Sequence, residues 1–282
     1  MMQTLHFTKM HGLGNDYIYF NVIDHPLPNP NALSVTLSDR HKGIGGDGIV
    51  LIGKSSAGDF SMRIFNADGS EAKMCGNASR CIGKYLYDKG LTDKKVIRLD
   101  TLSGIKTLNL HVDESNKVDT VDVDMGEGKL LNLPDGTIER DTVTAFGQKF
   151  TATAIDMGNP HLVLFVNNAE TVDVANIGAS LETNPKFPGG INVEFVQVID
   201  RNHIRMRVWE RGSGITKACG TGACASAVAC AMANLTEPEK CIVQMDGGSL
   251  HITYNPRNHQ VTMTGTATTV FEGEMEIENY KL

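Results

Sequence analysis

The sequence predicts an α+β protein of two pseudo-symmetric lobes, each a curved β-sheet or barrel around a central helix. Two observations predict it. Phrases from the first half of the chain recur in the second half at a constant offset of 144 residues, and the register holds over about a hundred residues. A helix pattern follows each recurring cysteine phrase, and strand patterns flank it. We therefore expect two copies of one lobe.

The repeat places Cys75 and Cys219 at equivalent points. The matching phrases are 62–65 with 206–209, 73–76 with 217–220, 14–15 with 158–159 and 45–46 with 189–190. We expect residues 1–117 to form the N-terminal lobe, completed by the C-terminal tail at about 265–282. Residues 118–264 should form the C-terminal lobe.

The two helices that follow the cysteines are the clearest expected elements. Residues 77–89 carry apolar side chains on one face, and Gly90 is a typical C-terminal stop. Residues 221–235 are almost all small and apolar, and a helix that is apolar all round is buried on all sides. We therefore expect a curved sheet to enclose this helix.

Shorter patterns fill the rest of each copy. Strands are expected at 17–23, 48–52, 61–65, 118–124, 161–166, 193–198 and 204–209, and short helices at 34–41 and 177–181.

Composition excludes several classes of partner. The chain has 282 residues with 26 basic and 33 acidic side chains, a net charge of −7, and no basic run, so nucleic acid and anionic membranes are poor partners. The longest small-apolar stretch, 223–233, is too short to span a bilayer. Residues 1–11 lack the apolar core of a signal peptide. We expect a cytoplasmic protein.

The six cysteines should then be reduced thiols. No two of them form a C-x-x-C pair, so the sequence predicts no metal site. We expect buried, inert thiols at Cys81, Cys224, Cys230 and Cys241.

Cys75 and Cys219 differ from the other four because each stands just before an expected helix. The backbone N–H groups of Gly76, Asn77, Gly220 and Thr221 would lack intrahelical partners and favour an anion. The helix dipole should also lower the pKa of each thiol. Two thiols on opposite sides of one ligand suit the removal of a proton from one face of a carbon and its return to the other.

Other polar residues recur near glycines. Asn15 and Asn159 are repeat equivalents and are candidates to line a cleft, where amides suit an amino acid's ammonium and carboxylate. Glu210 and Arg211 precede a glycine-rich loop. They could form a surface ion pair, or bind an ammonium and a carboxylate respectively.

Residues 43–48 match G-x-G-x-x-G, but a helix pattern precedes them and a strand pattern follows. The nucleotide motif needs the reverse order, so we expect no nucleotide site there, and no cofactor of any kind.

The chain resembles the diaminopimelate epimerase family over essentially its full length. The phrases that carry the resemblance are 12–16, 65–70, 74–77, 158–161, 210–212 and 218–222. The resemblance implies cofactor-independent interconversion of LL- and meso-diaminopimelate, which supplies lysine and peptidoglycan synthesis. It also implies a homodimer of two-lobed subunits.

The resemblance further implies site residues. Cys75 and Cys219 would be the acid/base pair, with Cys219 accepting and Cys75 donating the proton in the LL-to-meso direction. His161 would support catalysis, and Glu210 would be a further catalytic residue. Substrate contacts are implied for Asn15, Asn66, Gly76, Asn77, Asn159, Asn192, Glu210, Arg211, Gly220 and Thr221.

Three positions depart from the family pattern. Gly48 replaces a glutamine found in many members, and Ala78 and Ser79 replace the usual pair after C-G-N. The aromatic residue associated with the dimer contact, a tyrosine in some members, is Phe271. Two alternatives stay open: a racemase or epimerase of the proline or hydroxyproline type, and a non-catalytic amino-acid-binding protein.

Overall fold

The computed structural model describes residues 2–278 of the chain. The chain divides into two compact units. The first is Met1–Val123 with Gly265–Leu282, and the second is Asp124–Thr264. The boundary lies six residues beyond the expected one at 117/118. The reason is that β8 (Val118–Glu127) begins as a partner of β7 (Gly104–Val112), so its first residues belong to the first unit.

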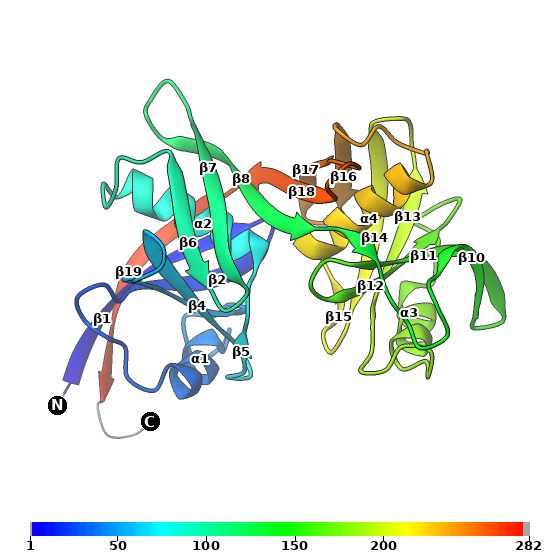
Figure 1. Cartoon of the computed structure of the whole chain (residues 1–282). Helices are drawn as coiled ribbons and strands as arrows, with labels where there is room; N and C mark the ends of the chain where they lie inside the picture. Colours follow the sequence, from blue (N-terminus) through cyan, green and yellow to red (C-terminus); the bar gives the residue numbers. More distant parts are fainter. Residues whose placement is uncertain (1, 279–282) are drawn as a thin grey trace. The chain divides into compact units, whose positions relative to one another are not determined.

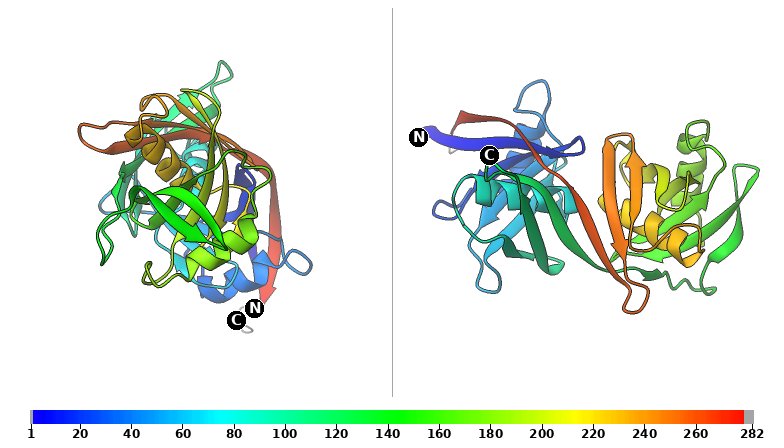
Figure 2. Two further views of the ribbon diagram at one scale, coloured as in Figure 1. Left: turned by 90° about the vertical axis from the view of Figure 1, so that its right-hand side faces the viewer. Right: turned by 90° about the horizontal axis from the view of Figure 1, so that it is seen from above.

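The first unit is a mixed sheet with two helices. Its strands follow the order β19-β1-β2-β3-β4-β6-β7-β8, with parallel pairs at β2–β3 and β4–β6. Their bounds are β1 Met2–Gly12, β2 Asn15–Asn21, β3 Gly48–Gly53, β4 Phe60–Asn66, β6 Val96–Thr101 and β19 Thr268–Glu278. The short β5 (Glu71–Ala72) pairs with β4. The first and last strands of the chain lie side by side (Figure 2).

The second unit repeats this plan. Its strands follow the order β10-β11-β12-β13-β14-β16-β17-β18, with parallel pairs at β12–β13 and β14–β16. Their bounds are β10 Glu139–Ala145, β11 Gln148–Asp156, β12 Pro160–Phe165, β13 Asn192–Val198, β14 His203–Glu210, β16 Cys241–Met245, β17 Gly248–Tyr254 and β18 Gln260–Thr266. The short β9 (Lys129–Leu130) pairs with β11, and β15 (Gly214–Thr216) with β14. The expected internal repeat is therefore a repeat of strand order and direction.

One helix in each unit follows its cysteine and lies against the strands: α2 (Gly76–Asp88) and α4 (Gly220–Met232) (Figure 1). The buried residues of α4 run without a break from Gly222 to Cys230, as its all-apolar sequence predicts. Small side chains let the surrounding strands approach closely. In the first unit, Gly83 on α2 has the same role, because a Cβ there would lie 2.7 Å from a methyl of Leu110.

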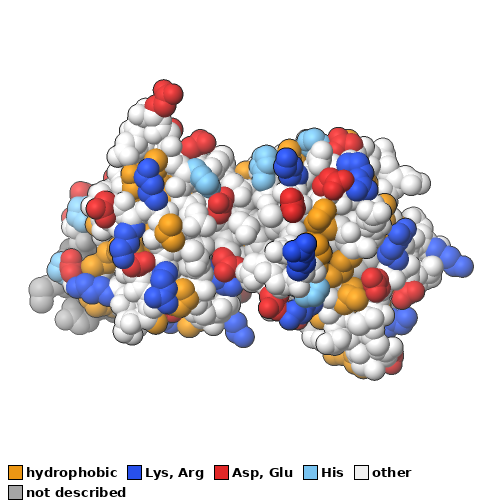
Figure 3. All heavy atoms as spheres, turned by 45° about the horizontal axis from the view of Figure 1, so that its top comes forward, with side chains coloured by type: hydrophobic (Ala, Val, Ile, Leu, Met, Phe, Trp, Pro, Cys, Tyr) orange, Lys and Arg blue, Asp and Glu red, His pale blue; other side chains and the backbone are white. Residues whose placement is uncertain are grey.

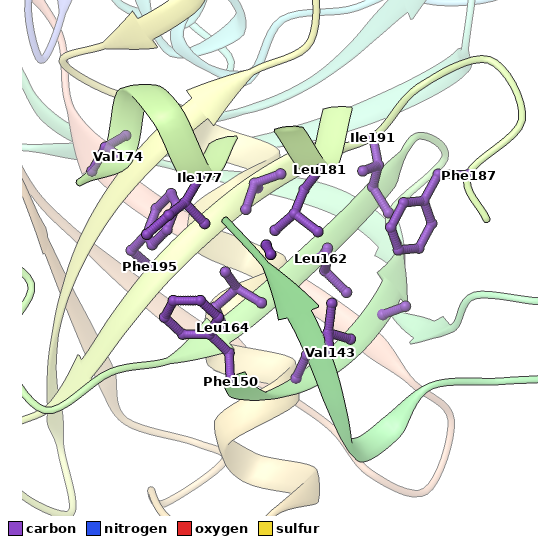
Figure 4. Close-up of a cluster of buried hydrophobic side chains, with 14 residues drawn as sticks. Val143, Phe150, Leu162, Leu164, Val174, Ile177, Leu181, Phe187, Ile191 and Phe195 are labelled. Atoms are coloured by element: carbon purple, nitrogen blue, oxygen red, sulfur yellow. The ribbon is translucent and has the colours of Figure 1, made fainter. Parts of the chain in front are cut away.

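The other two helices, α1 (Pro30–Ser38) and α3 (Val174–Glu182), each cover a separate apolar cluster. In the second unit, the side chains of α3 point toward those of β10, β11, β12 and β13 (Figure 4). In the first unit, α1 starts four residues before the expected helix at 34–41 and ends three residues before its end. Pro30 suits a first turn, and Asp39 ends the helix by accepting from the N–H groups of His41 and Lys42.

Among the described residues, no helix combines enough length with enough apolar character to cross a membrane.

Candidate active site

Cys75 is the N-cap residue of α2, with an extended backbone (φ −142°, ψ 119°). Its Sγ lies 3.5 Å from Oδ1 of Asn15 at the start of β2. The same oxygen accepts a 3.2 Å hydrogen bond from Nδ2 of Asn77 on α2. Three of the expected site residues therefore meet in the first unit, and Asn15 Oδ1 is the atom they share.

Asp47 fixes the orientation of Asn15. Its Oδ2 accepts hydrogen bonds from Nδ2 of Asn15 at 2.8 Å and from the backbone N–H of Asp16 at 3.0 Å. Arg40 donates to Asp47 at 3.0 Å and to Asp16 at 2.6 Å, and Lys9 pairs with Asp16. Asp47 belongs to the glycine-rich phrase set aside as a nucleotide motif. In the structure, this phrase brings the carboxylate of Asp47 to Asn15 as an acceptor.

Arg80 fixes the orientation of Asn77. Its side chain is fully buried, and its Nη2 donates to Oδ1 of Asn77 at 2.9 Å. Its Nε donates to the carbonyl of Thr266 at 3.0 Å, which ties the start of α2 to the chain just before β19. These hydrogen bonds to neutral oxygens offset part of the cost of burying the guanidinium. Neither Asp47 nor Arg80 was expected from the sequence to support the site.

Asn66 and Gly48 face each other in the register of β3 and β4. Nδ2 of Asn66 donates to Oγ of Ser70 at 3.0 Å in the turn that follows β4. At position 48 a Cβ would lie 2.2 Å from the carbonyl oxygen of Phe65. The backbone as it stands therefore leaves no room for a side chain at this position.

Cys219 is the N-cap residue of α4, again with an extended backbone (φ −127°, ψ 111°). Its Sγ accepts a hydrogen bond from the backbone N–H of Gly222 at 3.4 Å and lies 3.6 Å from Oγ1 of Thr221. The N-terminal backbone groups of α4 thus point at the thiol, as the position before a helix predicts.

The pKa of Cys219 is nevertheless raised well above the ordinary thiol range, which corrects the expectation that the helix would lower it. Burial is the largest cause, and the negative charges of Glu210 and Glu194 add to it. The hydrogen bonds from Gly222 and Thr221 act in the opposite direction but are outweighed. Without substrate, this environment keeps the thiol protonated.

Glu210 ends β14 and accepts a hydrogen bond from Oγ1 of Thr216 on β15. Burial raises the pKa of this carboxyl above its ordinary range, although hydrogen bonds from Thr216 and Cys219 work against the shift. Among the described residues, Glu210 forms no ion pair with Arg211. Nη1 of Arg211 instead donates to the carbonyl of Gly189 at 2.9 Å.

Asn192 holds two loops of the second unit together. Its Nδ2 donates to the carbonyl of Pro160 at 2.9 Å, and its Oδ1 accepts from the backbone N–H of Arg211 at 3.0 Å. Arg211 is therefore anchored by its own backbone, and its guanidinium rests on the glycine loop at 189–190.

His161 is completely buried and links two other residues. Its Nδ1 lies 2.6 Å from Oε1 of Glu194, and its Nε2 lies 3.1 Å from Oδ1 of Asn159. Nδ2 of Asn159 donates to Oγ1 of Thr221 at 3.4 Å, beside Cys219. Glu194, like Asp47 and Arg80, was not expected from the sequence to support the site. A lone carboxylate within the apolar run of β13 was the signal that could have revealed it.

Cys81, Cys224, Cys230 and Cys241 are buried, as expected. Burial raises the pKa of Cys81 and of Cys241 to about 11 each. Among residues 2–278, no group of three or more His, Cys, Asp or Glu side chains has the arrangement of a metal site.

The model of the family described as diaminopimelate epimerase matches residues 7–131 and 153–270. This chain belongs to the diaminopimelate epimerase family. It is 55% identical over 282 residues to a diaminopimelate epimerase of Phocaeicola vulgatus, covering 98% of this chain and all of that one. It is 54% identical over 277 residues to one of Parabacteroides distasonis, again covering 98% and 100%. The resemblance read from the motifs is thereby confirmed.

Solved structures share the fold at lower identity. A phenazine biosynthesis protein of the PhzF family from Bacillus anthracis superposes with a TM-score of 0.73 at 16% identity, covering 98% of this chain and 100% of that one. A hydroxyproline epimerase from Agrobacterium vitis, with bound trans-4-hydroxy-L-proline, gives 0.70 at 15% identity, covering 99% and 92%. They confirm the predicted α+β class with two lobes.

Proposed function

We propose that this chain is a cofactor-independent epimerase that interconverts LL- and meso-diaminopimelate with two cysteines as acid and base. One observation carries the proposal: in a member of the diaminopimelate epimerase family, each unit presents a cysteine as the N-cap of its central helix. The reaction would contribute to lysine and peptidoglycan precursor synthesis.

In the proposed reaction, one thiolate takes the α-proton from one face of the α-carbon, and the thiol of the other unit gives a proton to the opposite face. In the LL-to-meso direction Cys219 is the acceptor and Cys75 the donor. The two cysteines end each turnover with their protonation states exchanged. No electrons leave the substrate, so the reaction needs no redox partner.

Ionisation of Cys219 is the unfavourable step, because burial and two carboxylates raise the pKa of its thiol. A substrate ammonium placed at Glu210 would neutralise one of those charges. A substrate carboxylate at the N-termini of α2 and α4 would meet the N–H groups of Gly76, Asn77, Gly220 and Thr221. The same groups stabilise the negative charge that develops when the α-proton leaves.

The asymmetric residues supply specificity for a molecule with two amino-acid ends. At equivalent repeat positions, Asn66 corresponds to Glu210, and Ala67 to Arg211. We assign the distal carboxylate to Arg211, whose guanidinium is held on the carbonyl of Gly189. The amides of Asn15, Asn66, Asn77, Asn159 and Asn192 would complete the contacts.

The proposed setting is the cytoplasm, with a homodimer as the working form. Val270 and Phe271 on β19 are exposed apolar side chains that suit such a contact. Light scattering at two protein concentrations tests the dimer. On the face shown in Figure 3, acidic and basic side chains are interspersed in each unit.

The deciding experiment incubates the protein with LL-diaminopimelate in D₂O and separates the products by chiral chromatography. We expect meso-diaminopimelate with deuterium at the epimerised carbon. Proline and hydroxyproline are tested in the same assay, and deuterium uptake into either would support the alternative of a proline- or hydroxyproline-type racemase or epimerase. Tight binding of diaminopimelate without any deuterium uptake would leave only an amino-acid-binding protein.

A further inference from the structure

Glu194 is a carboxylate at a position where the fold does not need one. It lies in β13 between Val193 and Phe195, and all three side chains are fully buried. The equivalent residue of the first unit, 144 positions earlier, is Val50 in β3, also fully buried. Burying a carboxylate is costly unless it is paired. An apolar residue would satisfy the strand, so the carboxylate has another role.

Oε1 of Glu194 lies 2.6 Å from Nδ1 of His161, while Oε2 has no hydrogen-bond partner within the described part of the chain. The other ring nitrogen of His161, Nε2, faces Oδ1 of Asn159 at 3.1 Å. Both nitrogens therefore face oxygens. The amide oxygen Oδ1 of Asn159 accepts but cannot donate, so Nε2 carries the hydrogen in this contact, and Nδ1 faces the carboxylate of Glu194.

Two sets of contacts connect the Glu194–His161 pair with the thiol of Cys219. In the first set, Asn159 donates to Oγ1 of Thr221 at 3.4 Å, and that oxygen lies 3.6 Å from Sγ of Cys219. In the second set, Gly222 separates carboxylate and thiol: a Cβ there would lie 2.7 Å from Oε1 of Glu194 and 3.2 Å from Sγ. Glycine at 222 is thus what lets a buried carboxylate approach the N-terminus of α4.

We propose that Glu194 is a positioning residue of the Cys219 half-site, meaning Cys219 and the residues of the second unit around it. Glu194 holds His161 with its Nε2–H directed at Asn159. The hydrogen bond from His161 keeps Oδ1 of Asn159 occupied, so its Nδ2 stays turned toward Thr221 beside the thiol. The kinetic part of the proposal rests on the proposed function, whereas the state of the imidazole can be measured without turnover.

Two substitutions of Glu194 separate the effect of its hydrogen bond to His161 from the effect of its volume. Glu194→Val copies Val50 of the first unit and removes the partner of Nδ1. Glu194→Gln can donate from its amide to Nδ1 and so keeps Nε2–H on His161. We expect Glu194→Val to lower kcat by about 10- to 100-fold with KM little changed, by analogy with the loss of a hydrogen-bond partner of a metal-bound histidine. Glu194→Gln should recover most of this loss.

His161→Phe supplies the double-mutant test. If Glu194 acts through His161, Glu194→Val should have no further effect on kcat in the His161→Phe background. We expect the double variant to fold, because replacing both members of a buried polar pair by apolar residues is far less destabilising than removing one of them. Thr236→Val, which changes a buried hydroxyl of the same unit, is the control for a purely structural effect.

The readout without turnover is the NMR spectrum of protein labelled with ¹⁵N-histidine, in which the His161 signal is identified by its absence from His161→Phe. We expect a protonated Nε2 in the parent and in Glu194→Gln, and a mixture of tautomers in Glu194→Val. The proposal is overturned by a bare Nε2 in the parent, by parental kcat in Glu194→Val, or by an equal loss of kcat with and without His161. If the parent shows no epimerisation but the expected Nε2–H, the proposed function fails and the positioning role stands.

Discussion

Oδ2 of Asp47 accepts a 2.8 Å hydrogen bond from Nδ2 of Asn15, and Oδ1 of Asn15 consequently faces Cys75 and Asn77. An asparagine amide can rotate by half a turn and exchange donor for acceptor. Asp47 prevents this, because a carboxylate accepts but does not donate. The orientation of the half-site at Cys75 therefore depends on a residue that does not touch the thiol.

We predict that Asp47→Ala lowers kcat/KM by about 10- to 100-fold, as expected for the loss of a hydrogen bond to a charged group worth roughly 1.5–3 kcal/mol. The measurement is steady-state epimerisation of LL-diaminopimelate. Arg40→Met is the matched control, since it removes the exposed partner of Asp47 and leaves the bond to Asn15 intact. If Asp47→Ala has the kinetics of the parent, Asp47 does not control the orientation of Asn15 during the reaction.

Cys75→Ala and Cys219→Ala should each abolish epimerisation, because with one thiol gone no group serves one face of the α-carbon. Each acid or base group typically contributes about 10²–10⁴-fold. Chiral chromatography of the products measures the loss. Cys230→Ala, at a buried thiol of α4, is the control and should keep turnover. Near-normal activity of either single variant at 75 or 219 contradicts the two-base mechanism.

The titration of Cys219 provides a test by pH. Burial and the charges of Glu210 and Glu194 raise the pKa of this thiol, so the thiolate forms only at pH values well above the ordinary thiol range. Without substrate, the rate at which iodoacetamide alkylates Cys219 should therefore increase only at pH values above those for an ordinary thiol. Glu210→Gln removes one negative charge and should move the increase to lower pH. An unmoved profile, with Glu239→Gln as the exposed-charge control, would mean that Glu210 does not act on the thiol.

Arg211→Met should raise KM for diaminopimelate strongly, since truncating one side of a desolvated charge pair costs about 2–5 kcal/mol. It should also reduce the discrimination against amino acids that lack a second carboxylate. Competition by such amino acids in the epimerisation assay measures the change. If the variant binds and epimerises diaminopimelate as the parent does, the asparagines alone set specificity.

A stability prediction concerns the packing of α3 on β14. A Cβ at Gly178 would lie 2.5 Å from Cβ and Cγ of Trp209, whose indole N–H donates to Glu182 at 2.6 Å. The indole cannot move without losing that bond, so Gly178→Ala should destabilise the protein by about 1–3 kcal/mol. Thermal unfolding followed by circular dichroism measures it. Ser180→Ala on the exposed face of the same helix should change the midpoint little, and equal midpoints for the two variants would contradict this reading of the contact.

The sequence by itself determined the repeat, the helices α2 and α4, and the equivalent places of Cys75 and Cys219 just before them. It could do so because periodicity, small-residue composition and the C-G phrase are local properties of the chain. The helices α2 and α4 begin at Gly76 and Gly220, immediately after the cysteines, as the phrases indicate. The four other cysteines could be assigned to the core for the same reason.

Only the tertiary structure revealed how each half-site is held in place. Asp47 lies 32 positions from Asn15 in the chain, and Glu194 lies 33 positions from His161, so no local pattern pairs either carboxylate with its partner. Arg80 is close to Cys75 in sequence, but its contact with Thr266 comes from the other end of the chain. The pKa of Cys219 was decided in the same way. A helix N-terminus read from sequence predicts a lowered value, but burial and two carboxylates brought in by β13 and β14 reverse its sign, because electrostatic effects depend on distance in space and on exclusion of water.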